Sequence, residues 1–335
     1  MVSAPPVIDF EPFYSGDVER KALLIRQIRH ACERHGFFQL VNHRVPTDLQ
    51  EAILNQARDL FRLPLEIKDK YSKDIEPFNL GYERLRAQKF GKGSLGDLKE
   101  GYFICREFPP DHPSHGSFLL ASNKYPQEIR DPAGFRSVMI DYHAAMNELA
   151  LNILKVLART LDLEENWFDA YGHESANTVR LLRYPPQEAT ASKDERGIGA
   201  HTDFAGITIL LQDATGGLQV WDREASQWAD AVPFPGALVV NLGNLFMRWT
   251  NDRYLSNLHR VINKSGRERY SVPFFFSGNQ DYLVECIPSC KAATEEAKYP
   301  PTTVGEWVEA RYADTYGSGQ KKEGELSKDV LHATN

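Results

Sequence analysis

Three side chains that can bind a metal ion stand out in the sequence: His201 and Asp203, two residues apart, and the more distant His259. In a β-strand, side chains two residues apart point to the same side, so His201 and Asp203 are expected to lie together. His259 is the best candidate for a third ligand that arrives from another strand. Two histidines and one carboxylate on one face of an iron ion leave positions open for a cosubstrate and dioxygen. The spacing therefore suggests a non-haem Fe(II) centre.

A second motif strengthens this hypothesis, because a His-x-Asp tripeptide also arises by chance. Arg269 and Ser271 follow His259 by about ten residues and begin a run that continues into three phenylalanines. If this run is a strand, both side chains lie on one face. An arginine buried among aromatic residues needs an anionic partner. A carboxylate held by the guanidinium and the hydroxyl would satisfy that need.

The composition argues against several classes of protein. The formal net charge of −7 comes without a basic stripe, so we expect a small-molecule partner, no nucleic acid and no obligate protein partner. No run is long enough to span a membrane and the first residues lack a signal-peptide pattern, so we expect a cytoplasmic location and no membrane contact. The four cysteines are too scattered for a disulfide framework or a zinc site, and we expect reduced thiols.

Helical periodicity predicts three long helices in the first half of the chain. Asp17 can cap the first, and Gly36 follows it where a C′ residue belongs. Thr47, with Gln50 three residues later, suggests a capping box for the second. An Asp-Pro pair at 131–132 suggests an N-cap and a proline in the first turn of the third and longest helix. The expected ranges are about 17–35, 47–64 and 131–163.

Short β-type runs separated by turn residues dominate from about residue 177 onwards. This spacing is typical of a β-sandwich or barrel and differs from alternating βαβ units. The runs in this half are 178–184, 208–211, 217–221, 238–242 and 270–276, before a helix at 304–316. Further strands are expected at 7–10, 37–41 and 100–104.

These patterns divide the chain into three parts with mixed α/β content overall. Residues 1–125 form an N-terminal region of helices and short strands, and 126–317 form a β core with a long supporting helix. Residues 318–335 are a charged tail that we expect to be mobile. Local patterns place residues 70–130 least well, because glycine, proline and charged residues dominate there.

Several motifs, taken with the residues above, make the sequence similar to the isopenicillin N synthase-like family of Fe(II)/2-oxoglutarate-dependent oxygenases. The similarity extends from about residue 6 to 316. It implies a double-stranded β-helix, or jelly roll, as the catalytic core, with an N-terminal oxygenase region packed around it. The motifs are Ala31-Cys32-Glu33-Arg34-His35-Gly36-Phe37-Phe38, Leu98-Lys99-Glu100-Gly101-Tyr102, Tyr184-Pro185-Pro186, His201-Thr202-Asp203, Trp249-Thr250-Asn251-Asp252-Arg253-Tyr254, His259-Arg260-Val261 and Arg269-Tyr270-Ser271.

The resemblance implies a role for each residue of the chemical motifs. The two histidines and the aspartate named above would bind Fe(II). Arg269 and Ser271 would hold the distal carboxylate of the cosubstrate 2-oxoglutarate, with the hydroxyl of Tyr184 as a third partner. The keto-acid end would chelate the iron, and dioxygen would take the remaining position. The implied reaction oxidises a C–H bond of a small organic molecule, by hydroxylation, desaturation or ring formation, and releases succinate and carbon dioxide.

One departure from the family pattern bears on the substrate. Many relatives have Asn two residues before the tyrosine of Tyr-Pro-Pro, where this chain has Leu182. By strand alternation Arg180 and Leu182 share a face with Tyr184, so Arg180 is expected to point into the barrel. There it would bind an oxygen-bearing or anionic part of the substrate. A structural ion pair at the rim of the barrel is the alternative interpretation of Arg180. Asn244 stands where many relatives have Asp.

Four aromatic residues are further candidates for the substrate pocket. Phe275 lies on the same face of its strand as the Arg-x-Ser motif, although core packing is the alternative. Tyr102 and Phe103 follow a glycine that relatives also have. Phe204 comes directly after Asp203.

Three other functions remain open on the sequence alone. An iron-dependent oxidase of the isopenicillin N synthase type uses its Arg-x-Ser motif for a substrate carboxylate and needs no 2-oxoglutarate. A jelly roll that only binds a ligand would share the fold without the catalysis. A zinc hydrolase could use two histidines and an aspartate, but it would leave Arg269 and Ser271 unexplained.

Overall fold

The computed structural model describes residues 2–88, 96–187 and 196–316, and it is built around two β-sheets that face each other. The major sheet has eight strands in the order β1-β2-β10-β7-β12-β5-β4-β3, and the minor sheet has four in the order β6-β11-β8-β9. Apolar side chains of both sheets pack in the space between them, including Leu182 and Leu210 from the major sheet and Leu218 and Val261 from the minor sheet. The expected jelly-roll architecture with mixed α/β content is confirmed.

The strands are short, with two to eight residues each. The major sheet contains β1 (Val7–Asp9), β2 (Phe37–Val41), β3 (Gly81–Glu83), β4 (Glu100–Cys105), β5 (Asn177–Tyr184), β7 (Ile207–Gln212), β10 (Leu238–Leu242) and β12 (Arg269–Phe276). The minor sheet contains β6 (Ile198–His201), β8 (Leu218–Asp222), β9 (Gln227–Asp230) and β11 (His259–Val261). A separate pair joins β13 (Leu283–Val284) and β14 (Thr302–Thr303).

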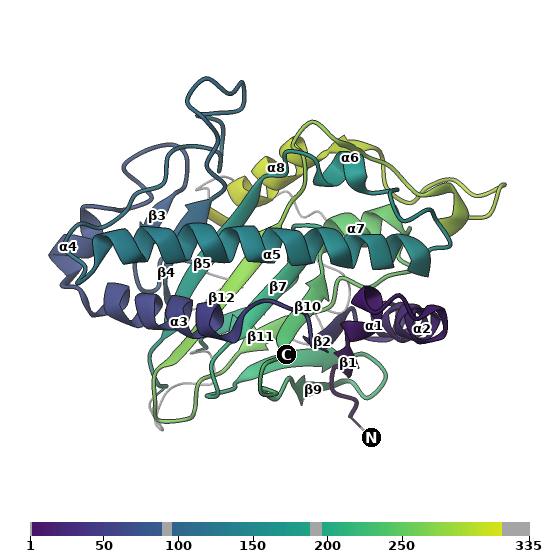
Figure 1. Ribbon diagram of the computed structural model, residues 1–335, viewed down its shortest axis with the longest axis horizontal. Helices are drawn as coiled ribbons and strands as arrows, with labels where there is room; N and C mark the ends of the chain where they lie inside the picture. Colours follow the sequence, from purple (N-terminus) through teal and green to yellow (C-terminus); the bar gives the residue numbers. More distant parts are fainter. Residues whose placement is uncertain (1, 89–95, 188–195, 317–335) are drawn as a thin grey trace.

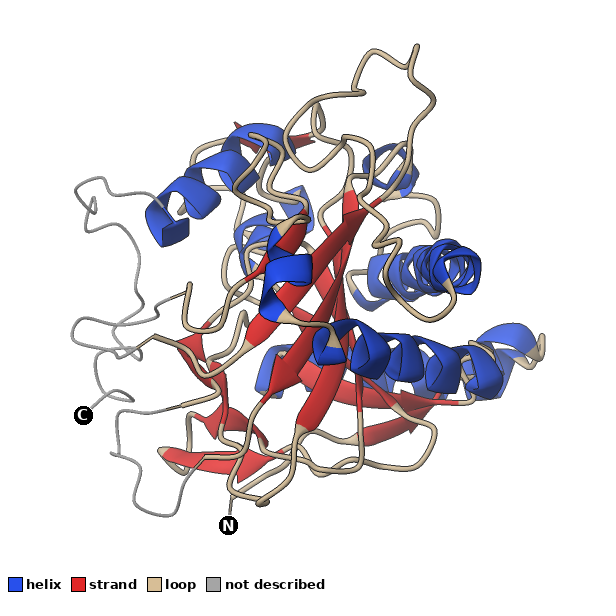
Figure 2. Cartoon of the chain, turned by 90° about the vertical axis from the view of Figure 1, so that its left-hand side faces the viewer, coloured by secondary structure: helices blue, strands red, loops and turns tan. Residues whose placement is uncertain are grey.

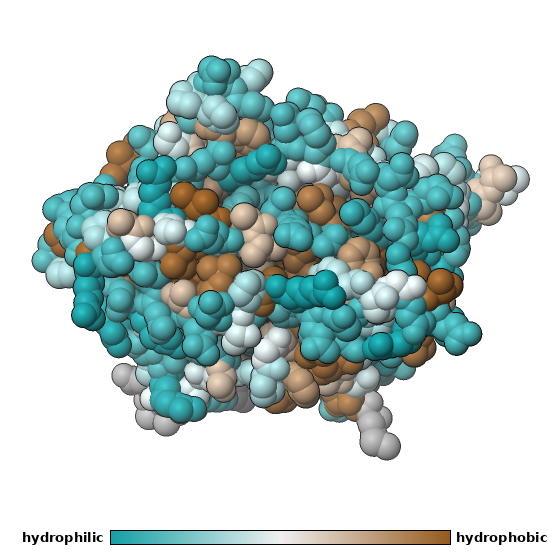
Figure 3. Space-filling view, in the orientation of Figure 1, coloured by the Kyte–Doolittle hydropathy of each residue, from teal (hydrophilic) through white to brown (hydrophobic). Residues whose placement is uncertain are grey.

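Helices cover the outer face of the major sheet. The longest, α5 (Pro132–Thr160), crosses the strands, with α3 (Thr47–Arg62) beside it and α2 (Val18–Arg34) at the edge (Figure 1). Figure 2 looks nearly along α5, which lies on one side of the strands. The outward surface of this layer is mostly hydrophilic, with scattered hydrophobic residues (Figure 3). The shorter helices are α1 (Glu11–Tyr14), α4 (Leu65–Asp69), α6 (Asp169–Gly172), α7 (Asn244–Trp249) and α8 (Val304–Tyr316), with a 3-10 turn at Pro288–Cys290.

Side chains alternate between the two faces of each strand of the major sheet. One face packs against the helices and the other against the minor sheet, so the protein has two interiors. In β5, Val179 and Leu181 face the helices and belong to the main hydrophobic core, whereas Leu182 and Tyr184 belong to the cluster between the sheets. Both faces of the sheet are therefore buried, which explains why the central strands read as apolar runs without a polar face. The second interior, between the sheets, is the one that can hold a ligand.

The structure confirms two of the predicted helix caps and contradicts one. Asp17 caps α2 by accepting a hydrogen bond from the amide of Arg20, and Asp131 caps α5 by accepting from Gly134, as predicted. Gly36 follows the C-cap residue His35 of α2 and has φ +64°, a conformation that glycine adopts without strain. The predicted capping box of Thr47 and Gln50 is wrong. Pro46 is the residue before α3, and the buried Gln50 amide donates instead to the carbonyl of Val45.

The N-terminal region is part of the same sheet as the jelly roll. Strands β1 and β2 extend one edge of the major sheet beyond β10, and β4 and β3 extend the other edge beyond β5. The division near residue 125 stays a prediction, because chain segments on both sides of it share this one sheet. The tail 318–335 lies outside the described residues. Within the described ranges, no helix is long and apolar enough to cross a membrane.

The cap of α5 provides a test of this fold. Replacing Asp131 by Ala should lower the free energy of unfolding by about 1 kcal/mol, because the amide of Gly134 loses its acceptor. Urea denaturation followed by circular dichroism measures the change. Asp131→Ser is the matched control and should keep most of the stability, since serine also caps helices. Equal losses in the two variants would contradict the assigned cap.

Candidate functional site

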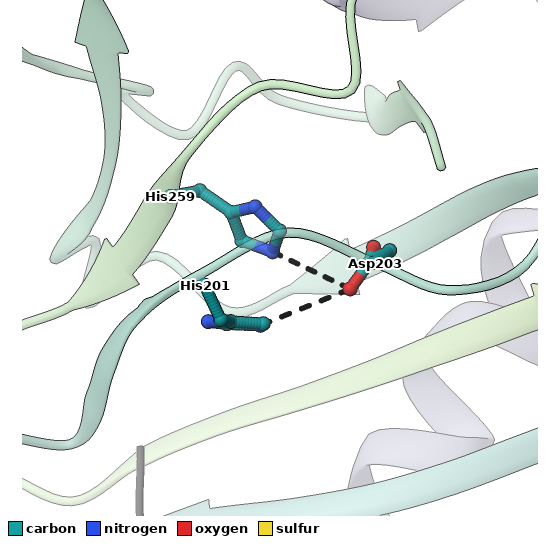
Figure 4. Close-up of side chains that lie close together, drawn as sticks. All are labelled: His201, Asp203 and His259. Atoms are coloured by element: carbon teal, nitrogen blue, oxygen red, sulfur yellow. Dashed lines mark ion pairs between the residues drawn. The ribbon is translucent and has the colours of Figure 1, made fainter. Parts of the chain in front are cut away.

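The structure brings the three expected metal ligands together between the sheets (Figure 4). His201 is the last residue of β6 and pairs directly with His259, the first residue of β11. Asp203 Oδ1 lies 3.8 Å from His201 Nε2 and 3.6 Å from His259 Nε2. The three ligand atoms lie within 4.8 Å of one another, so one metal ion can reach all of them.

The reason for this proximity differs from the one inferred from the sequence. Strand β6 ends at His201, and Asp203 lies in the loop that follows. Period-two alternation therefore does not place Asp203 beside His201, and that part of the reasoning is wrong. The pairing of β6 with β11 aligns the two histidines, and hydrogen bonds to the major sheet hold the aspartate.

Backbone carbonyls orient both imidazoles for metal binding. Nδ1 of His201 lies 2.9 Å from the carbonyl oxygen of Gly199, and Nδ1 of His259 lies 3.2 Å from that of Asn257. A carbonyl oxygen can only accept a hydrogen bond, so each Nδ1 carries the proton. The lone pair then resides on Nε2, the atom that faces Asp203.

Asp203 is oriented by two polar side chains from neighbouring strands. Its Oδ2 accepts hydrogen bonds from Thr208 Oγ1 at 2.6 Å and from Asn241 Nδ2 at 2.7 Å. Thr208 in β7 and Asn241 in β10 pair directly across the major sheet. With Oδ2 saturated in this way, Oδ1 is the oxygen presented to the histidines. The sequence analysis missed both residues, although each is a polar residue inside an otherwise apolar strand, and that signal could have found them.

The electrostatics keep His201 and Asp203 in the protonation states that a metal needs. Burial and the neighbouring His259 lower the pKa of His201 to about 3, so its imidazole is neutral near pH 7. Burial alone would raise the pKa of Asp203. The two imidazoles and the bonds from Thr208 and Asn241 outweigh burial, so the pKa is lowered and the carboxylate stays ionised. Neutral imidazoles and an ionised carboxylate are the forms that bind metal ions.

Arg269 forms the second part of the site and is fully buried. Its Nη1 donates to Ser271 Oγ at 3.0 Å and its Nη2 to Gln212 Oε1 at 3.1 Å, while Nε donates to the carbonyl of Gly216. The guanidinium lies 4.8 Å from the ring centre of Tyr184. No carboxylate of the described residues pairs with Arg269, so this buried cation lacks an anion. The carboxylate of a ligand fits that need.

One cavity connects the two parts. Together with the open solvent at its mouth it has an empty volume of about 1010 Å³. It is lined by the metal triad, by the anchor residues Arg269, Ser271 and Tyr184, and by a set of apolar side chains. The apolar wall is made by Phe37, Leu182, Ile198, Leu210, Leu218 and Val261.

Three of the expected aromatic pocket residues line this cavity, and one does not. Phe103, Phe204 and Phe275 contribute to its wall. Tyr102 faces the opposite side of β4, where it packs edge-on against Phe135 of α5. Its hydroxyl donates to the carbonyl of Lys124. The expectation that Tyr102 lines the pocket is therefore corrected, because neighbouring residues of a strand face opposite sides.

Arg180 points into the barrel, as expected, and is also part of an ion pair, whereas its contact with substrate stays a prediction. It lines the cavity, and it also forms an ion pair with Glu83 of β3 in the interior of the protein. Its guanidinium stacks 4.4 Å from the ring centre of Phe103. Glu83 and Gln88 belong to the segment that local sequence patterns could not place, and so does Lys99, which contacts both. The sequence analysis missed these partners, because only the pairing of β3 with β4 brings them to Arg180.

Asn244, which stands where many relatives have Asp, holds the metal-binding loop. Asn244 bridges the hydroxyls of Thr202 and Ser256 and donates its backbone amide to the carbonyl of Asp203. It therefore holds the loop that carries the aspartate.

The C-terminal helix α8 also contributes to the site. Tyr312 and Val308 of α8 line the cavity, and Trp307 donates its indole N–H to the carbonyl of Phe204. The C-terminal helix is thus attached directly to the metal-binding loop.

Comparisons with known proteins agree with this geometry. Residues 5–128 match the family described as non-haem dioxygenase in morphine synthesis N-terminal, and residues 175–278 match the 2OG-Fe(II) oxygenase superfamily. A 2-oxoglutarate-Fe(II) type oxidoreductase, hxnY of Emericella nidulans, is 48% identical over 97% of this chain and 94% of its own length. The 2-oxoglutarate-dependent dioxygenase citB of Monascus ruber is 36% identical over 93% and 95%.

A solved structure gives the same result. A full-length Neurospora crassa protein in complex with alpha-KG and thymine superposes with a TM-score of 0.81 at 31% identity, over 92% of this chain and 96% of that one. The fold and site define an iron-dependent oxygenase built on a double-stranded β-helix. The chain belongs to the 2OG-Fe(II) oxygenase superfamily and is a 2-oxoglutarate- and Fe(II)-dependent enzyme. The relatives' names favour 2-oxoglutarate users over an oxidase that needs no cosubstrate.

We call the two hydrogen bonds from Thr208 and Asn241 to Asp203 the clamp. The clamp predicts the effect of a variant outside the three metal ligands. Thr208→Val keeps the shape of the side chain but removes the hydroxyl that binds Oδ2. Loss of such an outer partner should weaken Fe(II) affinity by roughly 10-fold or more. Anaerobic titration of the metal-free protein with Fe(II) measures this affinity. Thr178→Val, at a buried threonine of β5 that does not contact Asp203, should bind iron normally, and equal affinities in both variants would argue against the clamp.

Proposed function

We propose that His201, Asp203 and His259 bind the iron and that Arg269, Ser271 and Tyr184 bind the distal carboxylate of 2-oxoglutarate. The observation that carries this assignment is the presence, in one cavity, of a three-ligand cluster and a buried guanidinium without a carboxylate partner among the described residues. When bound, iron and 2-oxoglutarate supply the activation of dioxygen that oxidises a C–H bond of the substrate, with release of succinate and carbon dioxide.

The anchor residues act by positioning. Arg269 is held on three sides by Ser271, Gln212 and the carbonyl of Gly216, so its guanidinium has little freedom. Burial raises the pKa of Tyr184 although Arg269 opposes this effect, so the hydroxyl stays protonated and can donate a hydrogen bond. A dicarboxylate held at this end presents its other end to the metal triad in one orientation.

The apolar wall of the cavity excludes water from the space between Arg269 and the metal ligands. Leu182 occupies the position where many relatives have Asn, and with Leu210 and Leu218 it encloses the cavity in hydrocarbon. Excluding water in this way strengthens the interaction of Arg269 with a carboxylate, because charges attract each other more strongly in a medium of low dielectric constant.

The substrate is proposed to lie at the aromatic end of the cavity. Phe103 stacks on Arg180 there, and Phe204 and Phe275 also line the cavity. Aromatic walls favour a planar molecule, since aromatic rings stack or meet edge to face. The Neurospora crassa structures hold thymine or 5-formyluracil, which supports a small ring compound as the class of substrate for this protein.

A substrate screen tests the proposed function. Small ring compounds are incubated with the Fe(II) protein, 2-oxoglutarate and oxygen, and succinate release is followed together with the mass of the product. We expect a subset to stimulate succinate release and to gain one oxygen atom. A product that lacks two hydrogens would indicate desaturation or ring closure. Stimulated turnover that persists in His201→Ala would contradict the assigned metal centre.

Arg269 should determine the affinity for the cosubstrate. Arg269→Ala removes a charge-assisted bond worth about 1.5–3 kcal/mol, so the KM for 2-oxoglutarate should rise by at least about 10-fold. Arg269→Lys should recover only part of this loss, because an ammonium group lacks the planar fork of a guanidinium. Arg267→Ala, at an exposed position two residues away, serves as the control. An unchanged KM in Arg269→Ala would exclude the proposed anchor.

Arg180 should affect the substrate and leave the cosubstrate unaffected. Arg180→Lys keeps a positive charge for the buried Glu83 but loses the planar donors that face the cavity. We expect the KM for the substrate to rise several-fold, while turnover of 2-oxoglutarate without substrate stays the same. The lysine variant is preferred to alanine, because alanine would remove one of the two cations that pair with the buried Glu83 and would lower the stability of the protein. Unchanged substrate kinetics would remove the role of Arg180.

A further inference from the structure

A buried polar cluster at the substrate end of the cavity has no part in binding iron or 2-oxoglutarate. It consists of Glu83, Gln88, Lys99 and Arg180, each of which is at most 6% exposed. Lys99 Nζ donates to Gln88 Oε1 at 2.6 Å and to Glu83 Oε2 at 3.2 Å. Arg180 donates to the same two oxygens, with both of its Nη atoms 3.3 Å from Gln88 Oε1. Only Gln88 and Arg180 of these four also line the cavity.

The hydrogen bonds determine which way the Gln88 amide points. Arg180 has donors and no acceptor, and a protonated Lys99 is also only a donor. The amide atom between these two cations must therefore be the carbonyl oxygen. The NH₂ group then points away from them, and within the described residues it has no hydrogen-bond acceptor. Because Gln88 lines the cavity, this free donor can serve a ligand.

The side chain of the neighbouring Arg180 is also held in place by its contacts. Its guanidinium lies over the ring of Phe103 and against Gly101, where an added Cβ would come within 3.0 Å of Nε. A side chain at position 101 would displace Arg180, which gives a physical reason for glycine in the Lys-Glu-Gly motif. Arg180 and Gln88 thus present hydrogen-bond donors from one rigid wall of the cavity.

The charges of this wall are already balanced. Lys99 and Arg180 are matched by Glu83 and by the buried Asp97, which accepts a hydrogen bond from the amide of Gly199. A ligand therefore meets directional donors rather than a bare cation. Phe103 stacks on Arg180, and Phe204 and Phe275 line the same cavity, so its aromatic walls favour a planar ring.

We propose that Gln88 is a specificity-determining residue whose amide NH₂, together with Arg180, binds an sp² oxygen on a planar substrate. The substrate class is a small aromatic or heteroaromatic compound that carries a carbonyl or a carboxylate group. This inference rests on the proposed function, because it assumes that the substrate lies in the cavity beside the iron. It assigns the oxygen-bearing part of the substrate to a defined pair of donors.

Binding of three matched probes tests the proposal without turnover. The anaerobic holoenzyme with Fe(II) and 2-oxoglutarate is titrated with 4-methylbenzamide, 4-methylbenzoate and para-xylene, and the shift of its visible absorption gives each Kd. We expect at least one oxygen-bearing probe to bind roughly 10-fold or more tightly than the hydrocarbon, since a site built for hydrogen bonding rejects analogues that lack the partner. The better of the two oxygen probes distinguishes an amide carbonyl from a carboxylate.

Two variants of Gln88 make the test specific. Gln88→Leu should abolish most of the preference for oxygen-bearing probes. Gln88→Glu keeps an acceptor for Lys99 and Arg180 but replaces the donor by an anion, so it should weaken the benzoate probe more than the benzamide probe. Gln127→Leu, at an exposed glutamine, is the control and should bind all probes normally.

The outcomes separate this inference from the proposed function. Oxygen-bearing probes that bind no better than the hydrocarbon, or an unchanged preference in Gln88→Leu, would overturn the role of Gln88. The absence of binding by both oxygen-bearing probes would overturn the substrate class as well. The visible band that forms when 2-oxoglutarate joins the Fe(II) protein tests the metal and cosubstrate assignment independently, and it should be the same in every Gln88 variant.

Discussion

The hydrogen bonds that hold Asp203 are the interaction on which the site depends. The aspartate lies in a loop after the minor sheet, but Thr208 and Asn241, which hold its Oδ2, form a direct pair within the major sheet. The metal ligands therefore have correct geometry only when the two sheets are packed against each other. Because the histidines come from β6 and β11 and the clamp comes from β7 and β10, folding of the jelly roll and formation of the metal site are one event.

Arg269 and Arg180 are both buried and face the same cavity, but their different partners give them different roles. Arg269 contacts only neutral acceptors among the described residues, so its charge is available for an anionic cosubstrate. Arg180 is already paired with Glu83, which leaves it as a directional donor in a polar cluster whose positive charges are offset by Glu83 and the nearby Asp97. The same residue type thus provides charge at one end of the cavity and hydrogen-bond geometry at the other.

The sequence predicted those features that depend on local patterns or on strong chemical motifs. The long helices, the Asp17 and Asp131 caps, the central strands and the cluster of metal ligands were all anticipated. The wrong inferences concern the surroundings of individual side chains. Strand β6 ends before Asp203, Tyr102 faces α5, and Gln50 bonds to the carbonyl of Val45 in place of a capping box with Thr47. The three-residue strand β3 brings Glu83 to Arg180, and no periodicity in so short a segment could reveal it.

A crystal structure of the anaerobic complex with Fe(II) and 2-oxoglutarate would show directly which residues hold the metal and the cosubstrate. We expect iron bound to Nε2 of both His201 and His259 and to Oδ1 of Asp203, with Oδ2 still held by Thr208 and Asn241. We also expect the distal carboxylate of 2-oxoglutarate on Arg269 and Ser271. Iron bound through other residues, or a cosubstrate carboxylate on Arg180 and Gln88, would contradict the division of the cavity into a cosubstrate end and a substrate end.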